Sequence, residues 1–268
     1  SERGGTTQIW RMRADGGGQE PVTDDEYNNW FPHPSPDGRW LAFLGRADTR
    51  PGLVLVRVDE LISDPELLAP VSGVNHPLPH TGEAFAWSPG TSRIAYVSGM
   101  PGPEGDGANG DPAVITRYLY KPYTSDGPSR FNDNRRLQLF MVDLVTRRPQ
   151  QLTDGPHHVH SLSWSSRGDD ILFASNQGPE PDRVFNDDVF AFNVVKRATR
   201  RLSDTPSAEY DPVWSPDGLS VAFRGTTRSR TSSETTMEDT HVWVMKADGT
   251  GRRDLGAAID NRQGAPQW

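Results

Sequence analysis

The chain contains no cysteine and no long apolar run, and both absences narrow what it can be. Without cysteine there is no disulfide, no thiolate zinc site and no cysteine nucleophile. No apolar stretch approaches the roughly 20 residues that a membrane-spanning helix needs. We therefore expect no membrane insertion, whereas the cellular compartment stays open.

The sequence also lacks the short motifs that mark the common catalytic sites. It has no Gly-x-Ser-x-Gly of serine hydrolases, no His-Glu-x-x-His and no phosphate-binding Gly-x-x-x-x-Gly-Lys. We therefore expect no catalytic residue, no metal site and no cofactor on this chain. The formal net charge is −8, and an acidic surface disfavours nucleic acid because phosphates require a basic face.

What the chain does contain is an internal repeat. Ser35-Pro36-Asp37-Gly38 recurs as Ser215-Pro216-Asp217-Gly218, and degraded copies follow Trp87 and Trp164. The residue before each copy marks the repeat, and the markers are Pro34, Trp87, Trp164, Trp214 and the final Trp268. They lie 53, 77, 50 and 54 residues apart. Blades of four strands repeat at about 40–50 residues, so these intervals fit a propeller with one insertion.

Each repeat predicts the same series of four strands. A short strand ends at the marker, and an apolar run such as Ile94-Ala95-Tyr96-Val97 follows the turn. A third, more alternating strand and a polar fourth strand complete the unit. The predicted fold class is an all-β propeller of four-stranded antiparallel blades, with four complete units and a split or incomplete fifth. A β-sandwich also has short strands and tight turns, but it would not repeat one four-strand order four times.

We expect one domain over residues 1–268, either a single propeller or a propeller fragment. Residues 1–26 supply only a third and a fourth strand, and residues 264–268 only a first strand. The chain would then close as a five-bladed ring with one defective blade, or belong to a longer propeller. The second reading is favoured because both ends fall inside a repeat. The segment from Asp59 to Ala69, with Glu60-Leu61-Ile62 and then Glu66-Leu67-Leu68, could hold one helical turn.

Four segments are candidates for binding. The insertion loop 99–136 fills the long interval, and its Ile115–Tyr120 part looks like a strand; it is either a functional loop or a surface excursion. His157, His158 and His160 precede a first strand, but no carboxylate accompanies them at a metal-binding spacing. A polar loop offers both signs of charge to a protein or peptide terminus, through Arg228, Arg230, Glu234, Glu238 and Asp239. Asn186-Asp187-Asp188 could face a cation or simply end a turn.

The repeat resembles a known family. Trp-Ser-Pro-Asp-Gly with the run Val242-Trp243-Val244-Met245-Lys246-Ala247-Asp248-Gly249 is similar to the TolB-type propeller repeat. From about Glu83 onward the chain resembles the N-terminal propeller of prolyl oligopeptidase family serine peptidases, of the acylaminoacyl-peptidase type. The residues that carry this likeness lie in 183–190, 209–214 and 233–243.

The resemblance implies two functions. In the peptidase family the propeller caps an α/β-hydrolase domain and restricts its substrates to small peptides; that domain is absent here, so no catalytic residue carries over. TolB-like proteins instead use the propeller as an independent scaffold for other proteins. A third hypothesis, glycosidase-type chemistry by paired carboxylates in the central channel, is the least favoured.

Overall fold

The computed structural model describes residues 5–59, 65–75, 82–104, 114–115, 117–120, 132–184, 186–226, 240–259 and 261–268. Regular structure in these ranges consists of β-strands alone. No helix among them is long and apolar enough to cross a membrane. The prediction of an all-β chain is confirmed.

The strands form four antiparallel sheets of four strands, which we call blades 1 to 4 in chain order. Blade 1 consists of β3 (Trp30–Pro34), β4 (Trp40–Ala47), β5 (Arg50–Arg57) and β6 (Glu66–Pro70). Blade 2 consists of β7 (Phe85–Trp87), β8 (Arg93–Pro101), β9 (Arg135–Asp143) and β10 (Pro149–Gln151). Blade 3 consists of β11 (His160–Trp164), β12 (Asp170–Ser175), β13 (Asp188–Asn193) and β14 (Ala198–Arg201). Blade 4 consists of β15 (Glu209–Trp214), β16 (Ser220–Thr226), β17 (Thr240–Lys246) and β18 (Arg253–Asp254).

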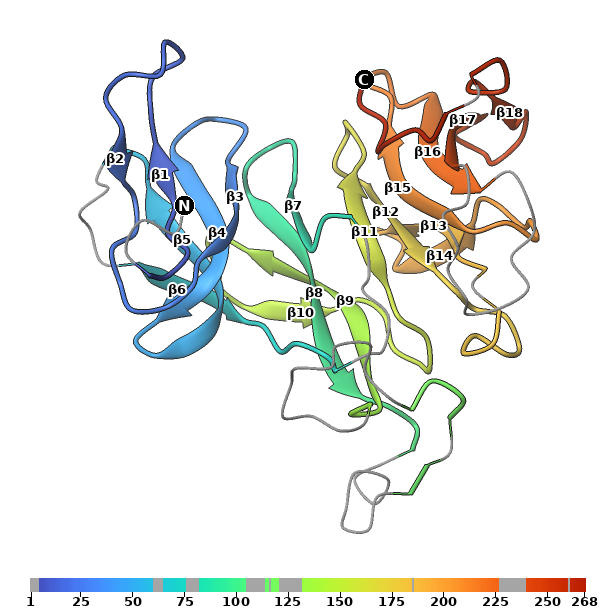
Figure 1. The fold of residues 1–268 in the computed structure, drawn as a ribbon, viewed down its shortest axis with the longest axis horizontal. Coiled ribbons are helices and arrows are strands. Elements are labelled where there is room, and N and C mark those ends of the chain that lie inside the picture. Colours follow the sequence, from blue (N-terminus) through green and yellow to red (C-terminus); the bar gives the residue numbers. More distant parts are fainter. Residues whose placement is uncertain are drawn as a thin grey trace.

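Strand order within each sheet follows chain order, so every blade is an up-and-down meander (Figure 1). Of the segment expected to hold one helical turn, Glu66–Leu68 lies in strand β6 instead, and Glu60–Ile62 lies outside the described residues. Leu68 and Ala69 are buried there, so pairing with β5 decides against the short helix. A fifth, two-stranded sheet precedes blade 1 and consists of β1 (Trp10–Arg11) and β2 (Glu20–Pro21). It supplies the predicted third and fourth strands near the N-terminus.

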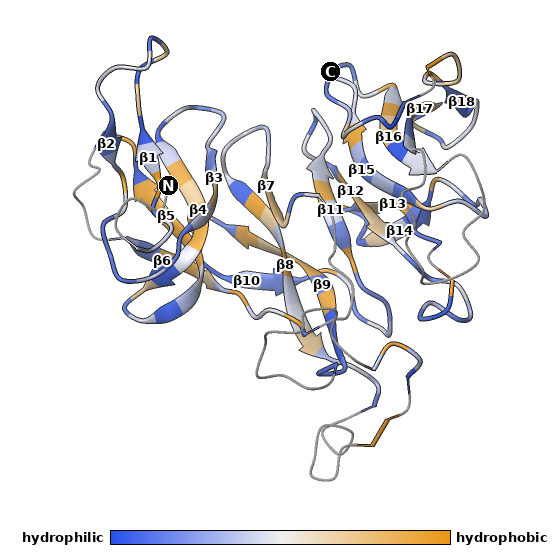
Figure 2. Cartoon of the chain, in the orientation of Figure 1, coloured by the Kyte–Doolittle hydropathy of each residue, from blue (hydrophilic) through white to orange (hydrophobic). Residues whose placement is uncertain are grey.

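The apolar cores lie between neighbouring sheets. On β8, Ile94 and Tyr96 pack toward blade 1, whereas Ala95 and Val97 pack toward blade 3. On β12, likewise, Phe173 packs toward blade 2 and Leu172 packs toward blade 4. Successive strand residues point to opposite faces, so a continuous apolar run fits a strand that is covered on both sides. Figure 2 shows the result, with apolar residues on β4 and β8 and hydrophilic ones on outer strands such as β10.

The repeated tetrapeptide builds the turn between first and second strands. Ser35 Oγ donates to Asp37 Oδ1 and accepts the Trp40 amide, and Gly38 has φ +71°. Ser215 and Gly218 repeat these features, with Ser215 Oγ accepting the Ser220 amide. A residue with positive φ is needed there, which is why glycine ends the motif.

Tryptophans before these turns join one blade to the next. The indole Nε1 of Trp87 donates to His33 O, and that of Trp164 to Ala86 O, both at 3.0 Å. Each acceptor lies one residue before the marker of the preceding blade. Trp214 is the exception, because its buried Nε1 has no partner among the described residues.

Residues 264–268 carry no assigned strand, contrary to the expectation of a first strand. Their contacts nevertheless match those of a first strand. Trp268 Nε1 donates to Val213 O, one residue before Trp214. The Gln263 amide bonds Thr240 O as the Glu209 amide bonds Asp187 O. The segment thus lies on blade 4 in the first-strand position, but without a described second strand to pair with.

We expect removal of an indole hydrogen bond between blades to lower stability more at a buried tryptophan than at an exposed one. Trp164 is 8% exposed, whereas Trp268 is 59% exposed. We expect Trp164→Phe to lower the free energy of unfolding by about 1–2 kcal/mol, through a lost hydrogen bond in a packed site. The matched control, Trp268→Phe, should change it by less than about 0.5 kcal/mol. Urea unfolding of both variants measures the difference, and equal losses would contradict the bridging role.

The hydrogen bonds of the turn motif predict a lowered pKa for Asp37. The Ser35 hydroxyl bond, followed by the Arg39 amide, lowers the pKa of Asp37 from 3.8 to about 2. Because the folded pKa is depressed, this contribution to stability is present above about pH 4 and is lost as the pH falls towards 2. In Ser35→Ala the Asp37 pKa should rise towards 3.8, while the Asp217 pKa stays low. Carboxyl ¹³C NMR titration measures both, and an unchanged Asp37 pKa in the variant would refute the assignment.

Candidate protein-binding face

Two kinds of connection share one edge of every blade. Because the strands are antiparallel, the connections from second to third strand lie beside those from fourth strand to the next first strand. Gln138 Nε2, at the start of β9, donates to the carbonyls of Gly155 and His157 in the following blade connection. We call this edge the loop face, and the opposite edge the turn face. In Figure 1 the turns after β7 and β11 lie at the top and the described parts of the insertion at the bottom.

The three predicted histidines lie on the loop face, but they do not converge. His160 is 5% exposed and bonds Asp187 Oδ1 through Nε2 at 3.2 Å. His158 Nδ1 accepts the Leu137 amide. Burial lowers the pKa of His157, which favours its neutral form. Among the residues described, no group of three or more His, Asp or Glu side chains could hold a metal ion.

The other predicted binding residues lie outside the described residues. They are Arg228, Arg230, Glu234, Glu238 and Asp239, in the connection between β16 and β17. Their assignment to binding therefore stays a prediction. By chain order this connection belongs to the same kind as the insertion, from a second to a third strand.

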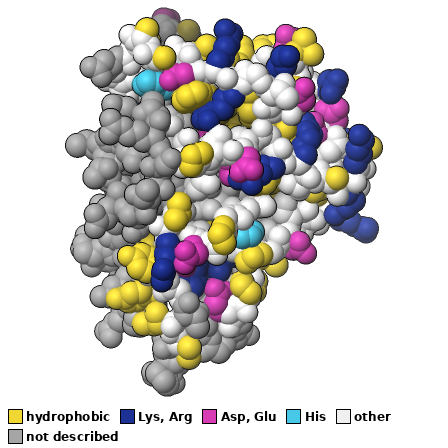
Figure 3. Space-filling view, turned by 90° about the vertical axis from the view of Figure 1, so that its right-hand side faces the viewer, with side chains coloured by type: hydrophobic (Ala, Val, Ile, Leu, Met, Phe, Trp, Pro, Cys, Tyr) yellow, Lys and Arg dark blue, Asp and Glu magenta, His cyan; other side chains and the backbone are white. Residues whose placement is uncertain are grey.

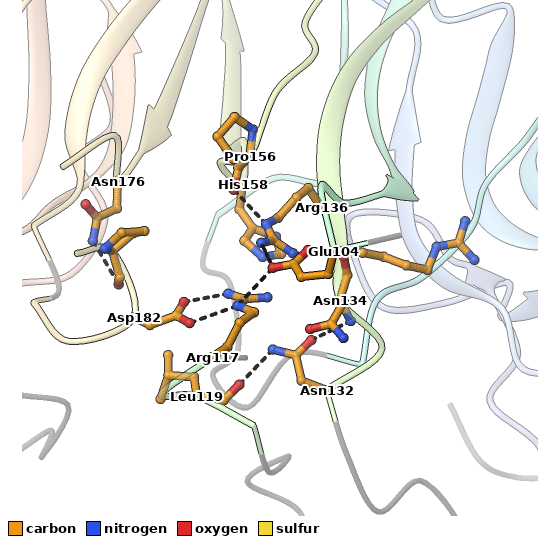
Figure 4. Close-up of polar contacts among 12 residues, drawn as sticks. Glu104, Arg117, Leu119, Asn132, Asn134, Arg136, Pro156, His158, Asn176 and Asp182 are labelled. Carbon is orange, nitrogen blue, oxygen red and sulfur yellow. Dashed lines mark hydrogen bonds and ion pairs between the residues drawn. The ribbon is translucent and has the colours of Figure 1, made fainter. Parts of the chain in front are cut away.

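A buried ion network holds the described parts of the insertion. Arg117 donates two hydrogen bonds to Asp182, from Nη2 at 2.5 Å and from Nε at 2.8 Å. Its Nε also lies 3.8 Å from Glu104 Oε1, which accepts a hydrogen bond from Arg136 at 2.7 Å. Figure 4 shows the Arg117 guanidinium between the two carboxylates. The four side chains are 5–16% exposed, so the pairs are largely shielded from water.

The network joins three segments of the loop face. Glu104 and Arg117 belong to the insertion, and Asp182 belongs to the connection between β12 and β13 of blade 3. Arg136, at the start of β9, also donates to the carbonyls of Pro156 and Asn134. Two positive and two negative charges balance, which reduces the penalty of burying them. The predicted strand at Ile115–Tyr120 is not formed in the described residues there; polar contacts hold this segment instead.

The carboxylates of the Asn186-Asp187-Asp188 triplet bond to residues of blade 3 and of the connection that follows it. Asp188 bonds Arg201 and accepts the Thr205 amide, and Asp187 bonds His160. Burial raises the pKa of Asp188, and the Arg201 bond opposes that shift. These partners give the carboxylates a structural role.

A second buried ion pair lies in blade 4. Glu209, at the start of β15, is fully buried and lies 3.0 Å from Arg252. The Arg252 guanidinium carbon lies 4.1 Å from the Trp243 ring centroid, a distance typical of a cation–π contact. Burial raises the pKa of Glu209, whereas hydrogen bonds and Arg252 lower it.

One arrangement has the connectivity of a catalytic triad. His160 Nδ1 lies 3.0 Å from Ser161 Oγ, and His160 Nε2 lies 3.2 Å from Asp187 Oδ1. Ser161 is only 2% exposed, and Gly82 packs on it so closely that a Cβ there would lie 2.6 Å from Ser161 Cβ. A nucleophile must reach its substrate, and this serine does not. The three groups therefore form a hydrogen-bonded contact within blade 3, between β11 and the start of β13.

The surface charges are mixed. On the side shown in Figure 3, Lys and Arg side chains are interspersed with Asp and Glu. Nucleic acid binding requires a concentrated basic surface, so this side does not favour it.

Sequence analysis missed the two ion networks. The partners of Arg117 and Arg252 lie 65 and 43 residues away in the chain, in other connections and strands. A single charged residue in a polar loop does not indicate, from the sequence, that it forms an ion pair with a distant residue. The one available hint was an arginine or glutamate inside a Gly- and Pro-rich stretch, which the sequence alone does not distinguish from a solvated charge.

No family model matches the chain. Similar curated proteins include an uncharacterised protein from Agrobacterium fabrum, 38% identical over 107 residues, covering 38% of this chain and 35% of that protein. Dipeptidyl-peptidase 5 from Porphyromonas gingivalis is 24% identical over 236 residues, covering 81% and 33%. TolB from Anaeromyxobacter is 32% identical over 133 residues, covering 49% and 26%. The chain therefore spans about a third or less of the length of these relatives.

Solved structures agree on the fold. TolB from Acinetobacter baumannii has a TM-score of 0.54 at 15% identity, covering 90% of this chain and 47% of that one. Acylaminoacyl peptidase from Pyrococcus horikoshii has a TM-score of 0.61 at 14% identity, covering 91% and 34%. The β-propeller domain of the trilobed protease from Pyrococcus furiosus has a TM-score of 0.58 at 12% identity, covering 96% and 66%. The sheets, the repeated turns and these likenesses show that the chain has a β-propeller fold, similar to the folds of TolB and of peptidase propeller domains.

Proposed function

We propose that this chain is a non-catalytic module that binds a protein or peptide through its loop face. The observation that carries the proposal is the insertion, which the buried Arg117–Asp182 pair ties to blade 3. A long connection held in place by a buried ion network forms a defined surface, and binding surfaces are commonly built on such loops. The covered Ser161 and the balanced ion pairs supply no reactive group for chemistry.

The more specific role we propose is that of a substrate-gating propeller of a prolyl oligopeptidase family serine peptidase. Dipeptidyl-peptidase 5, which matches 81% of the chain, supports this role, as does the likeness to acylaminoacyl peptidase. In this role the partner is an α/β-hydrolase domain, and the loop face borders the path of the peptide substrate. The alternative is an independent TolB-like interaction scaffold, which the match to TolB favours.

The ion network gives a test of the loop-face architecture. Asp182→Asn leaves Arg117 with a neutral partner, and breaking a buried pair typically costs about 3–5 kcal/mol. Because Asp182 is 16% exposed, we expect a loss of about 3 kcal/mol. The matched control is Glu180→Gln, whose pair with Arg183 is about 60% exposed on both sides. It should lose less than about 0.5 kcal/mol. Equal losses in chemical denaturation would show that the network does not fix this face.

The open reading frame that encodes the chain separates the two proposed roles. The gating role predicts a Gly-x-Ser-x-Gly motif within a few hundred codons after Trp268. Its hydrolase domain should then bind this chain, and Asp182→Asn should weaken that binding at least tenfold relative to Glu180→Gln. Isothermal titration of the two proteins measures the effect. A stop codon soon after Trp268 would contradict the gating role and leave the scaffold role.

A further inference from the structure

The connection after β10 contains an Asp-Gly pair, Asp154-Gly155, whose chemistry depends on how the fold holds it. In such a pair the glycine amide nitrogen can attack the aspartate side-chain carboxyl, because the glycine has no side chain to obstruct it. The new N–C bond expels water and closes a succinimide ring. Water then adds mainly to the main-chain carbonyl carbon of the aspartate and breaks its bond to the nitrogen. The product is isoaspartate, in which the backbone runs through the former side chain.

The described residues contain four other Asp-Gly pairs, and a hydrogen bond holds the glycine amide in each. The amide donates in every case to the carbonyl three residues earlier, at Gly16, Gly38, Gly218 and Gly249. An amide nitrogen held in this way is not free to turn towards the carboxyl. The repeated turn adds a second protection, because hydrogen bonds lower the pKa of Asp37 and Asp217. An ionised carboxylate is a poor target for a nucleophile.

The pair Asp154-Gly155 lacks this protection. Within the part of the chain that the structure describes, the Gly155 amide donates no hydrogen bond. Both residues are exposed. Gly155 has a φ of +115°, and the position that a Cβ would occupy is open. Glycine visits such conformations readily, so nothing described here prevents its nitrogen from reaching the carboxyl.

Blade 3 shows why this amide is free in blade 2. Thr205, the equivalent of Gly155, donates its amide to Asp188 Oδ1 at 3.2 Å. The residue of blade 2 in the place of Asp188 is Gln138. Its Nε2 donates to Gly155 O at 3.1 Å, and its Oε1 accepts the Thr153 hydroxyl. An amide in place of a carboxylate thus binds the carbonyl of Gly155 and leaves the nitrogen unbound.

Isoaspartate at this position would lengthen the main chain by one carbon beside two anchors of the loop face. The first anchor is the bond from Gln138 to Gly155 O. The second is the bond from Arg136 Nε to Pro156 O at 2.6 Å (Figure 4). Arg136 also donates to Glu104 of the insertion. The added carbon therefore displaces the carbonyls that orient two side chains at the base of the insertion.

We propose that Asp154-Gly155 is a site of spontaneous isoaspartate formation in the folded chain, and that this modification loosens the attachment of the insertion. The reaction consumes and returns one water molecule and needs no other reactant. Its product is a substrate for methyltransferases that recognise the isoaspartate carboxylate. The loop face then has a chemically limited lifetime, independent of what it binds.

The test incubates the full chain at neutral pH and physiological temperature for several weeks. Digestion with endoprotease Asp-N and electron-transfer mass spectrometry then locate isoaspartate peptide by peptide. We expect the Asp154-Gly155 peptide to gain isoaspartate at least tenfold faster than the Asp37-Gly38 and Asp217-Gly218 peptides. In denaturing urea the three pairs should react at similar rates, because the protecting hydrogen bonds are broken. The mapping also keeps apart the pairs outside the described residues, which are Asp106-Gly107, Asn109-Gly110 and Asp126-Gly127.

Two variants separate the hydrogen bond from the local sequence. Thr205→Gly creates an Asp-Gly pair after Asp204, in which Asp188 still accepts the amide. This pair should react at least fivefold more slowly than Asp154-Gly155. Gln138→Asp places a carboxylate where blade 3 has one, and it should slow the reaction at Asp154 at least threefold. The melting temperature of each variant is measured alongside, so that a loss of folding is recognised.

Hydrogen exchange tests the loosening. The Val159 amide donates to Leu137 O just after the site, and it should exchange at least threefold faster in the isoaspartate form. The Val189 amide, which donates to Ser203 Oγ in blade 3, should not change.

Three outcomes would overturn the proposal. Equal rates at Asp154-Gly155 and at the turn pairs of the folded chain would remove the site. An equally fast reaction in Thr205→Gly, with an unchanged melting temperature, would remove the role of the hydrogen bond. Unchanged exchange at Val159 would remove the loosening.

Discussion

The structure depends on the contact between neighbouring sheets. A four-stranded sheet of short strands has two faces to cover, and here each inner strand divides its apolar residues between two cores. Ile94 and Tyr96 serve one core and Ala95 and Val97 the next. Each blade is therefore stable only beside its neighbours, as in other repeat proteins. The chain needs neither disulfide nor helical layer in the described residues, because adjacent sheets already remove their apolar strands from water.

Because contacts between sheets fix the strands, the blades differ mainly in the connections at their edges. The turn face repeats because Ser35 and Ser215 must satisfy the same backbone groups in the same tight turn. The loop face is under no such constraint, so a 2-residue turn in blade 1 and the long insertion in blade 2 occupy equivalent places. Polar contacts, rather than strand pairing, then hold the longer connections, as the Arg117–Asp182 pair does. The two faces differ because one is fixed by local turn geometry and the other by contacts between distant residues.

That difference also decides what the sequence predicts. Turn chemistry and apolar runs act over a few residues, so strands such as Asp188–Asn193 and Ser220–Thr226 are found with nearly their true bounds. Glu66–Leu68 is ambiguous locally, and only its pairing with Leu55 and Val54 makes it a strand. Residues 264–268 read as a strand, yet a strand is assigned only where a partner pairs with it. The ion pairs join residues that are distant in the sequence and that only the fold brings together, so no local sequence pattern predicts them.

Comparison of equivalent positions in different blades also distinguishes features of the shared scaffold from features of a site. The left-handed φ of Ser161, its bond to His160 and the Asp187 contact suggest a catalytic elbow when seen alone. The same φ recurs at Phe31 and Asp211, three residues before the marker in each first strand, so the strained backbone belongs to the repeat. What does not recur is the side chain: the position holds a serine in blade 3, an aspartate in blade 4 and a phenylalanine in blade 1. In a propeller, therefore, backbone strain that recurs at the same position of several repeats belongs to the architecture and is not by itself evidence of a catalytic site.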